Sequence, residues 1–350
     1  MTAFMDVLLF GFLLVTAIGI VRTRDLFAAA MLGSLFSLLS AGLFMVMDAA
    51  DVAFTEAAVG AGISTVLFLA TLGLTHKNER DRPGPRMVPL LVVTATGALL
   101  VWGTLDLPEY GDPDAPAHTY MTPRFLDETP REIGIPNIVT AVLASYRGYD
   151  TFGEATVVFT AALGVLLLLS NRRREDGEEE STEPVVSSGL RALREQVQRG
   201  QQQVPEMRNR ILRMSVRPLI PAIMLFGLYV QFHGDYGPGG GFQAGVIFAA
   251  GVVLYGLVFG LERTRRAFPS DVIEAAIAGG VLLYGSVGVV SILRGGNFLD
   301  YDVLAEVPSH GQHLGIILIE LGVGITVAAV MLGLFLLFAA RGLRRPSREA

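Results

Sequence analysis

The sequence contains no cysteine, so it offers no disulfide framework, thiolate metal site, iron–sulfur ligand or thiol nucleophile. Charge is also scarce, because only 17% of the 350 residues are Asp, Glu, Lys or Arg, against about a quarter in soluble domains. The net charge is −6 and no basic aromatic patch occurs, which argues against nucleic acid as a partner. With 51% hydrophobic residues, the composition argues against a globular cytosolic enzyme.

Long apolar runs are the dominant feature of the chain. A helix needs about 20 mostly apolar residues to cross a bilayer, because its backbone polar groups must be satisfied within the segment. We therefore predict an all-α polytopic integral membrane protein with about nine transmembrane helices. The nine predicted spans are Ala3–Val21, Leu26–Met47, Val52–Leu74, Val88–Leu105, Phe152–Leu169, Pro218–Phe232, Phe242–Leu261, Val272–Leu293 and His313–Ala339.

Basic residues predict the orientation of these spans. One set of alternate connections carries 23 of the 27 Lys and Arg residues, and the other carries only Arg124, Arg131, Arg147 and Arg294. Because basic residues favour the cytoplasmic side, we expect the N-terminus outside and the C-terminus in the cytoplasm. The first span lacks a basic leading region and has no small-residue cleavage site after it, so we expect it to be retained.

The two longest connections suggest the domain organisation. The outside connection, 106–151, contains an apolar run at 133–146 that is too short to cross; it predicts a helix at the outer interface or, alternatively, a packed loop helix. The charged stretch 171–214 predicts a solvated cytoplasmic linker. The alternative is that its Leu-bearing face binds the membrane surface. The predicted units are 1–80 (three helices), 81–170 (two helices with the outside loop and interfacial helix), 171–214 (linker) and 215–350 (four helices).

Acidic residues at membrane depth are the first functional candidates, since a charge there costs at least about 2.5 kcal/mol on insertion scales. Glu56 lies early in the third span among small residues. Gly60 and Gly62 allow a neighbouring backbone to approach and weaken the helix enough to admit a bulge. This predicts a proton or cation relay at Glu56; the alternative is a hydrogen-bonded interhelical carboxylate.

A second acidic group lies at the start of the fifth span. Asp150 and Glu154 are four residues apart and share a face if the helix begins that early, while Arg147 is placed to neutralise one of them. Such a pair can bind a cation or share a proton. The alternative is an ordinary capped helix start.

The four-helix half carries the remaining candidates. Glu320, seven residues into the last span, is the deepest acid and has no partner nearby in the sequence. Glu274 lies near the cytoplasmic start of the eighth span, and His313 begins the ninth. His233 and Asp235 precede the glycines Gly239, Gly240 and Gly241, whose run predicts a tight helical turn or an ion-lined re-entrant loop. No histidine has metal-ligand spacing, and no cofactor is expected.

Three blocks together resemble one transporter family. The block 56–71 resembles a three-helix module near the C-terminal end of the large Mrp antiporter subunit, which is also a separate subunit of membrane-bound hydrogenases. The block 135–154, ending Tyr146-Arg147-Gly148-Tyr149-Asp150-Thr151-Phe152-Gly153-Glu154, resembles the two-helix module that follows it. The four-helix half, with His233-Gly234 and Pro238-Gly239-Gly240-Gly241-Phe242-Gln243-Ala244-Gly245, resembles the B subunit of Mrp-type Na⁺/H⁺ antiporters.

This resemblance implies a non-enzymatic, multi-pass subunit of a cation/proton antiporter in a bacterial or archaeal plasma (inner) membrane. Its expected partners are the other antiporter subunits, including the large antiporter-like ones, together with H⁺, Na⁺ or K⁺ and the lipid bilayer. In the family, the positions matching Glu56 and Glu154 are regarded as part of the ion pathway; Glu320 is nominated from its depth in the last span alone. Asp150, His233, Asp235, Glu274 and His313 are secondary candidates for this pathway.

The sequence departs from the family in lacking the large helical antiporter core, so we expect it to need partner subunits. Two alternatives remain open. One is a membrane subunit of a redox-driven pump related to hydrogenases, and the other is a scaffold without an ion pathway of its own.

Overall fold

The computed structural model describes residues 2–73, 75, 78–79, 87–109, 111–171 and 210–342. Within these ranges the regular structure is helical apart from one isolated bridge between Asp25 and Asn78. Nine helical segments there are long and apolar enough to cross a membrane, as the sequence predicts. The helices are α1 (Thr2–Arg22), α2 (Leu26–Val46), α3 (Ala50–Glu56), α4 (Ser64–Leu72), α5 (Met87–Gly103), α6 (Thr122–Glu132), α7 (Ile138–Thr140), α8 (Gly148–Asn171), α10 (Arg210–His233), α11 (Gly241–Phe259), α12 (Leu261–Ala267), α13 (Ser270–Leu293) and α14 (Pro308–Gly342).

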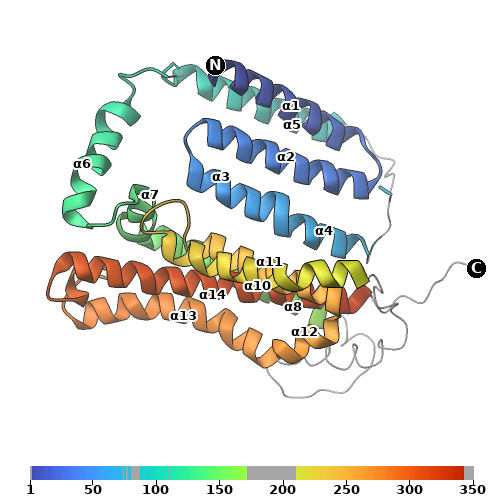
Figure 1. The fold of residues 1–350 in the computed structure, drawn as a ribbon. Coiled ribbons are helices and arrows are strands. Elements are labelled where there is room, and N and C mark those ends of the chain that lie inside the picture. Colours follow the sequence, from blue (N-terminus) through green and yellow to red (C-terminus); the bar gives the residue numbers. More distant parts are fainter. Residues whose placement is uncertain are drawn as a thin grey trace, which may run out of the picture.

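The long helices lie side by side in two groups (Figure 1). Helices α1, α2 and α3–α4 form a layer that meets a bundle of α8, α10, α11, α13 and α14. Helices α11 and α14 are the most buried of the spans and form the centre of this bundle. The turns α2–α3, α10–α11 and α13–α14 lie at one end of the molecule, with α6 and α7, whereas α12 and the α1–α2 turn lie at the other (Figure 1).

The third span is interrupted by a π-helix at Ala57–Ile63, directly after α3 and before α4. Two glycines in this stretch weaken the α-helical backbone. The wider turn frees the Ala61 carbonyl, which accepts hydrogen bonds from Ser34 Oγ of α2 at 2.9 Å and from Thr65 Oγ1 at 3.1 Å. The expected weak point next to Glu56 is therefore present as a π-helix.

The sixth span begins earlier than predicted, at Arg210 rather than Pro218. Pro218 and Pro221 lie inside α10, where each removes one backbone hydrogen bond but does not end the helix. The turns of α10 before Pro218 remain helical because Val216 is buried against Val258 and Phe259 of α11. Asn171 belongs to α8 and 210–214 to α10, so helical structure extends into both ends of the predicted linker, whose residues 172–209 lie outside the described part.

The connection between α5 and α8 folds as a series of short helices. Helix α6 is tied to the segment ending at Tyr146 because the Tyr146 hydroxyl donates a hydrogen bond to the Glu132 carboxylate, which also accepts one from Arg124 within α6. The apolar run becomes α7 and a π-helix, Ala141–Tyr146, in which Ala141 and Ala144 are buried. This π-helix packs against α14. It thereby forms one wall of the site described next.

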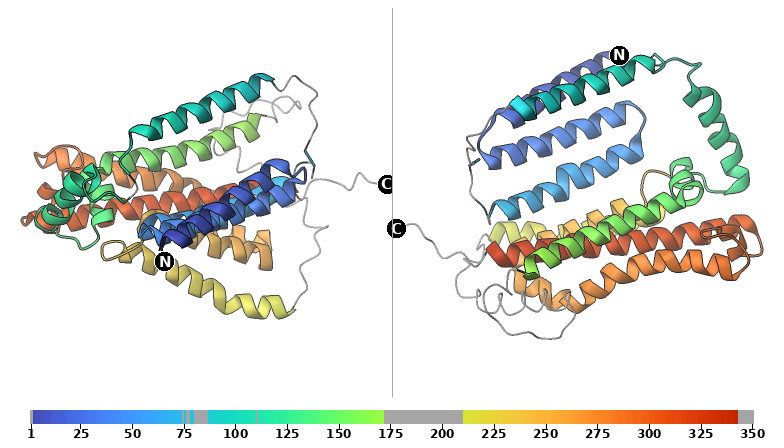
Figure 2. Two further views of the ribbon diagram at one scale, coloured as in Figure 1. Left: turned by 90° about the horizontal axis from the view of Figure 1, so that it is seen from above. Right: turned by 180° about the vertical axis from the view of Figure 1, so that it is seen from behind.

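Helix α5 stands apart from the rest of the described chain. None of its residues is buried there, although the helix is strongly apolar. The view from above places α5 away from α1, which it overlaps in Figure 1 (Figure 2). No residue of α5 lines the site described next.

Candidate functional site

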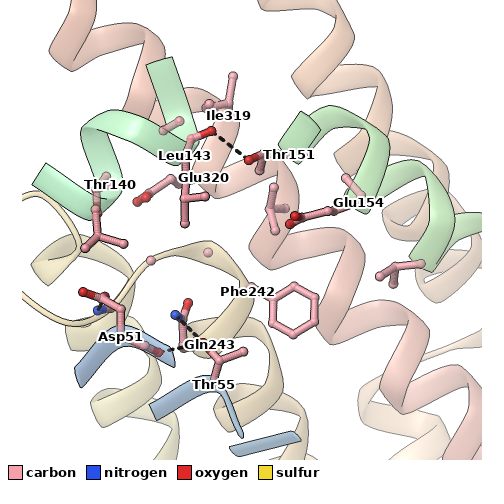
Figure 3. A pocket seen from close by; sticks show the side chains of 18 of the residues that line it. Asp51, Thr55, Thr140, Leu143, Thr151, Glu154, Phe242, Gln243, Ile319 and Glu320 are labelled. Atoms are coloured by element: carbon pink, nitrogen blue, oxygen red, sulfur yellow. Dashed lines mark hydrogen bonds between the residues drawn. The ribbon is translucent and has the colours of Figure 1, made fainter. Parts of the chain in front are cut away.

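A cavity of about 600 Å³ lies where the α3 layer meets the bundle. Its walls come from α3, the segment 139–144, α8, the loop before α11, and α14. Three acidic side chains from three distant parts of the chain line it: Asp51, Glu154 and Glu320 (Figure 3). Most of the remaining lining is apolar, with the exception of hydroxyls and one amide.

Asp51 fastens α3 to the glycine loop of the bundle. Its Oδ1 atom accepts a hydrogen bond from the Gly239 amide at 3.1 Å. One turn further along α3, Thr55 Oγ1 accepts a hydrogen bond from Gln243 Nε2 of α11 at 2.9 Å (Figure 3). These two bonds join parts of the chain that are 188 residues apart.

Glu320 lies on α14 against the same loop. A methyl group added at Gly234 would lie 3.0 Å from Glu320 Oε2, and one at Gly240 would lie 3.1 Å from Oε1. No hydrogen bond or ion pair to its carboxylate occurs among the residues that the structure describes. The first turn of α11, beginning at Gly241, lies beside it, and the positive end of a helix dipole favours a nearby carboxylate.

The glycine run is required by close packing of backbone on backbone. A methyl group at Gly241 would overlap the Glu320 carbonyl oxygen, and one at Gly239 would lie 2.6 Å from the Val230 carbonyl oxygen. Gly240 adopts a φ of +121°, which side-chain-bearing residues rarely adopt. The run is therefore a tight turn that brings the start of α11 directly onto α14.

Glu154 projects into the cavity from α8, which begins at Gly148. Asp150 and Glu154 consequently share a helical face, but only Glu154 lines the cavity. Asp150 is exposed and forms an ion pair with Arg147, whose Nη2 atom lies 2.6 Å from Asp150 Oδ2. Arg147 thus neutralises the member of the pair that faces away from the cavity.

Glu56 is not among the cavity residues. It is the last residue of α3, and its carboxylate lies between that helix and α2. A methyl group at Gly60 would lie 2.7 Å from Glu56 Oε1 and 2.5 Å from Ser37 Oγ, so only glycine leaves room for both. A methyl at Gly62 would meet only ordinary contacts, the nearest being the Ala57 carbonyl oxygen at 3.5 Å.

The secondary candidates divide between the two ends of the bundle. His233 stacks on Tyr229 with a centroid distance of 4.9 Å. Asp235 is 5% exposed and lies 2.8 Å from His313 Nδ1. Burial raises the pKa of Asp235, and the charge and hydrogen bond of His313 act against that rise. Glu274 lies half-buried in the second turn of α13 and does not line the cavity.

Asp51 is the cavity acid that the sequence reasoning missed. It lies just after the Asp48 turn, where an acidic residue is an ordinary helix-start residue. A usable signal is present, because Asp51 and Thr55 are four residues apart and place two polar groups on one helical face of an apolar span. Its hydrogen bond to Gly239 depends on how two distant segments dock.

The arrangement suits protons or monovalent cations. Three carboxylates face a largely apolar space, and the N-terminus of α11 supplies a fixed partial positive charge. In a medium of low polarity, each carboxylate favours a proton or a cation over an unpaired charge. The site can therefore receive, hold and release small positive species.

The comparisons with known proteins match three regions of the chain. Residues 211–333 match a domain related to the MnhB subunit of Na⁺/H⁺ antiporters, residues 11–77 match the MbhD component of MBH, and residues 97–185 match its MbhE component. A putative antiporter subunit mnhB2 of Staphylococcus aureus strain Newman is 32% identical over 129 residues, which are 36% of this chain and 91% of the relative. The Staphylococcus haemolyticus counterpart is 30% identical over the same length.

A solved structure supports the same fold. The Mrp complex from Dietzia sp. DQ12-45-1b contains a chain that matches 95% of this one with a TM-score of 0.69 and 24% sequence identity. The match covers 34% of that chain, so the present chain corresponds to about a third of its length. By its similarity to the mnhB2 subunits, the chain belongs to the MnhB family of Mrp antiporter subunits, with regions related to MbhD and MbhE in the same polypeptide.

Proposed function

We propose that this chain is a non-redox subunit of a monovalent cation/proton antiporter that uses the proton gradient to export Na⁺. In this proposal the cavity between α3, α8, α11 and α14 is a segment of the ion pathway. The supporting observation is the convergence of Asp51, Glu154 and Glu320 on one space from three regions of the chain. Isolated structural carboxylates would have no reason to converge in this way.

The proposal includes an orientation and a location. The N-terminus lies outside, the C-terminus lies in the cytoplasm, and the membrane is the plasma membrane of a bacterium or archaeon. In support, α12, which carries Arg263, Arg265 and Arg266, lies at the opposite end of the molecule from the turn between α10 and α11 (Figure 1). We also propose the units 1–80, 81–170, 171–214 and 215–350 as the functional division of the chain.

Glu56 continues the pathway beyond the cavity. It lies five residues after Asp51, about 7.5 Å further along the helix axis. The π-helix that follows it interrupts the regular hydrogen bonding of the span, as π-turns often do at functional sites. In this proposal Glu56 exchanges a proton or cation with the cavity acids. Glu56→Gln should then abolish antiport while the complex still assembles.

The regions matching MbhD and MbhE support a second candidate, a membrane subunit of a redox-driven ion pump. The same cavity could belong to an antiporter or to a redox-driven pump, and the two complexes differ in their partner subunits. Purification of the tagged chain in mild detergent, followed by mass spectrometry, distinguishes them. Large antiporter-like subunits without iron–sulfur proteins support the antiporter, whereas iron–sulfur and hydrogenase-like subunits would replace it with the redox machine.

A transport assay tests the pathway itself. Na⁺/H⁺ exchange is measured in vesicles containing the assembled complex with Asp51→Asn, Glu154→Gln or Glu320→Gln, alongside the wild type. We expect each variant to lose most of its exchange while the subunit composition is unchanged. Wild-type exchange in all three variants, and in Glu56→Gln, would instead make the chain a scaffold.

A further inference from the structure

Near the start of α14, a half-exposed histidine contacts a buried aspartate, and neither residue lines the cavity. His313 Nδ1 lies 2.8 Å from Asp235 Oδ2. The aspartate is 5% exposed, whereas the histidine side chain is 47% exposed. The imidazole therefore has one nitrogen on a buried carboxylate and much of its ring facing the surroundings.

The pair lies directly above a cavity acid. His313 and Glu320 are seven residues apart on α14, which is two helical turns on the same face. Gly234, the neighbour of Asp235, lies against the Glu320 carboxylate, and Asp235 is close enough to repel the charge on Glu320. A path from the surroundings therefore meets His313 first, then Asp235 and then Glu320.

The loop that carries Asp235 is held by hydrogen bonds from Asn137 and Thr140. The Asn137 amide donates to the Asp235 carbonyl at 2.9 Å, and Asn137 Nδ2 donates to the carbonyls of Gly234 and Gly237, each at 2.9 Å. Thr140 Oγ1 donates to the Gly234 carbonyl at 2.7 Å. This network fixes the position of Asp235 between the histidine and the cavity, so the pair is preorganised.

Other titratable groups lie on the elements that surround the pair. Glu320 and the exposed His310 lie on α14, His233 ends α10, and Asp51 projects from α3. Burial raises the pKa of Asp235, so this carboxyl holds a proton more readily than an exposed aspartate does. Histidine is the side chain whose ordinary titration falls between pH 5 and 8.

We propose that His313 and Asp235 form a proton relay between the outer aqueous phase and Glu320. The relay rests on the proposed ion pathway and supplies its outer proton-conducting step. A proton binds at His313 Nε2, the Nδ1 proton passes to Asp235 Oδ2, and the ring is left neutral as its other tautomer. Protonated Asp235 then gives this proton to a negative Glu320 and regains its own charge. Exchange of the exposed ring with water restores the starting tautomer.

Chemical rescue tests this relay in the assembled complex. The complex is reconstituted in proteoliposomes, and Na⁺ flux down an imposed gradient is measured at equal buffered pH on both sides, with and without imidazole. We expect His313→Ala to slow exchange roughly 100-fold, the lower end of what a positioned proton-transfer group contributes. Imidazole should restore much of the rate, because truncating a half-exposed ring leaves a space open to solvent.

Matched variants complete the experiment. His310→Ala, an exposed histidine one turn earlier on α14, should exchange at the wild-type rate. Asp235→Asn keeps the size of the side chain but cannot accept the proton, so it should be slow and unaffected by imidazole. The subunit composition of each preparation is checked by gel filtration.

The outcomes separate the relay from the pathway. Wild-type exchange in His313→Ala, or slow exchange that imidazole does not restore, would overturn the relay. Glu320→Gln is measured in the same series: loss of exchange there leaves the proposed pathway standing even if the relay fails. Wild-type exchange in Glu320→Gln would overturn both.

Discussion

At the scale of single residues, the cavity depends on how closely backbones approach. Glu320 lies against the loop at Gly234 and Gly240 only because neither residue has a side chain. Gly241 brings the first turn of α11 onto the backbone of α14. A carboxylate is thereby held beside the positive end of a helix, in a space that is mostly apolar.

Gly241→Ala should therefore disturb the site through packing. The added methyl overlaps the Glu320 carbonyl oxygen, which is backbone and cannot move aside without shifting α14. We expect a loss of stability of about 1–3 kcal/mol, typical of overpacking, together with weaker exchange. Gly279→Ala on α13 is the matched control, since no atom lies within 4 Å of the added methyl. Thermal denaturation of the purified complex measures the stability of each variant. Equal stability of Gly241→Ala and Gly279→Ala would contradict this account.

The contact between Asp235 and His313 predicts a pH effect. The raised pKa of Asp235 means that the folded protein binds this proton more tightly than the unfolded chain does. The contribution of Asp235 to stability is therefore largest below its ordinary pKa of 3.8 and falls as the pH rises through the folded value. His313→Gln removes the opposing charge, so the pKa of Asp235 should rise further. Infrared titration of the carboxyl band, with Asp235→Asn as the reference, measures the pKa of Asp235. An unchanged or lower pKa in His313→Gln would refute the electrostatic coupling between His313 and Asp235.

The sequence identifies some of these residues and misses others for clear reasons. Glu154 and Glu320 are acids within apolar spans. The free-energy cost of a charge in the membrane is by itself enough to single them out as functional candidates. Asp51 lies at the edge of a span, where an acid costs little, so its role depends on its contact with Gly239. The partnership of His313 with Asp235 joins segments 78 residues apart, and no spacing pattern indicates it.

At the scale of elements, the third span is the unusual one. It begins as α3, changes to a π-helix after Glu56 and returns to an α-helix at Ser64. The π-helix shifts the register between the part that carries Asp51 and the part that ends the span. Its glycines indicate a weak point in the sequence itself, whereas the contact of Ser34 with the freed Ala61 carbonyl depends on how α2 packs.

Deleting Gly62 should convert this stretch to a regular α-helix, because a π-turn contains one extra residue. The segments before and after the deletion would keep roughly their present orientation, but the wide turn and the hydrogen bond from Ser34 of α2 to the Ala61 carbonyl would be lost. We expect exchange to fall to background while the chain still inserts in the membrane. Gly62→Ala keeps the residue count and meets only ordinary contacts, so it should remain active. Full activity of the deletion would show that the π-helix has no functional part.

Helix α10 is an example of a helix boundary that the sequence alone does not predict correctly. A proline is a common first helical residue, so the sequence favours Pro218 as the start of the span. The helix instead begins at Arg210, because Val216 and Ile220 pack into a small cluster with Val258 and Phe259. Tertiary packing here outweighs the local cost of Pro218 and Pro221.

At the scale of the whole molecule, the cavity belongs to no single module. The region matching MbhD supplies Asp51, the region matching MbhE supplies Glu154, and the MnhB region supplies Glu320. Number and type of spans follow from hydropathy alone, and nine are found in the described residues. Which spans meet does not follow from hydropathy, because apolar helices in a membrane are distinguished mainly by small residues and polar contacts.

The contacts between modules predict that the covalent connection is dispensable. Asn137 and Thr140 bind the Gly234–Gly237 loop, and Asp51 binds Gly239, all across long sequence separations. Two chains comprising 1–190 and 191–350, expressed together, should therefore copurify and retain exchange. Adding Asn137→Ala to the split chains should weaken their association, whereas Asn297→Ala, an exposed residue of the α13–α14 turn, should not. Failure of the split halves to associate would show that the modules are held together by the connection.

If Glu320 belongs to an ion pathway in the cavity built by three modules, transport must depend on its carboxylate. Coupled Na⁺ and H⁺ fluxes are measured in proteoliposomes containing the purified complex with Glu320→Gln. Glu306→Gln, an acid in the exposed connection just before α14, serves as the control. The account predicts that both fluxes fall at least about tenfold in Glu320→Gln, as expected for loss of a proton-transfer group, and stay at the wild-type level in Glu306→Gln. Wild-type fluxes in a fully assembled Glu320→Gln complex would contradict it.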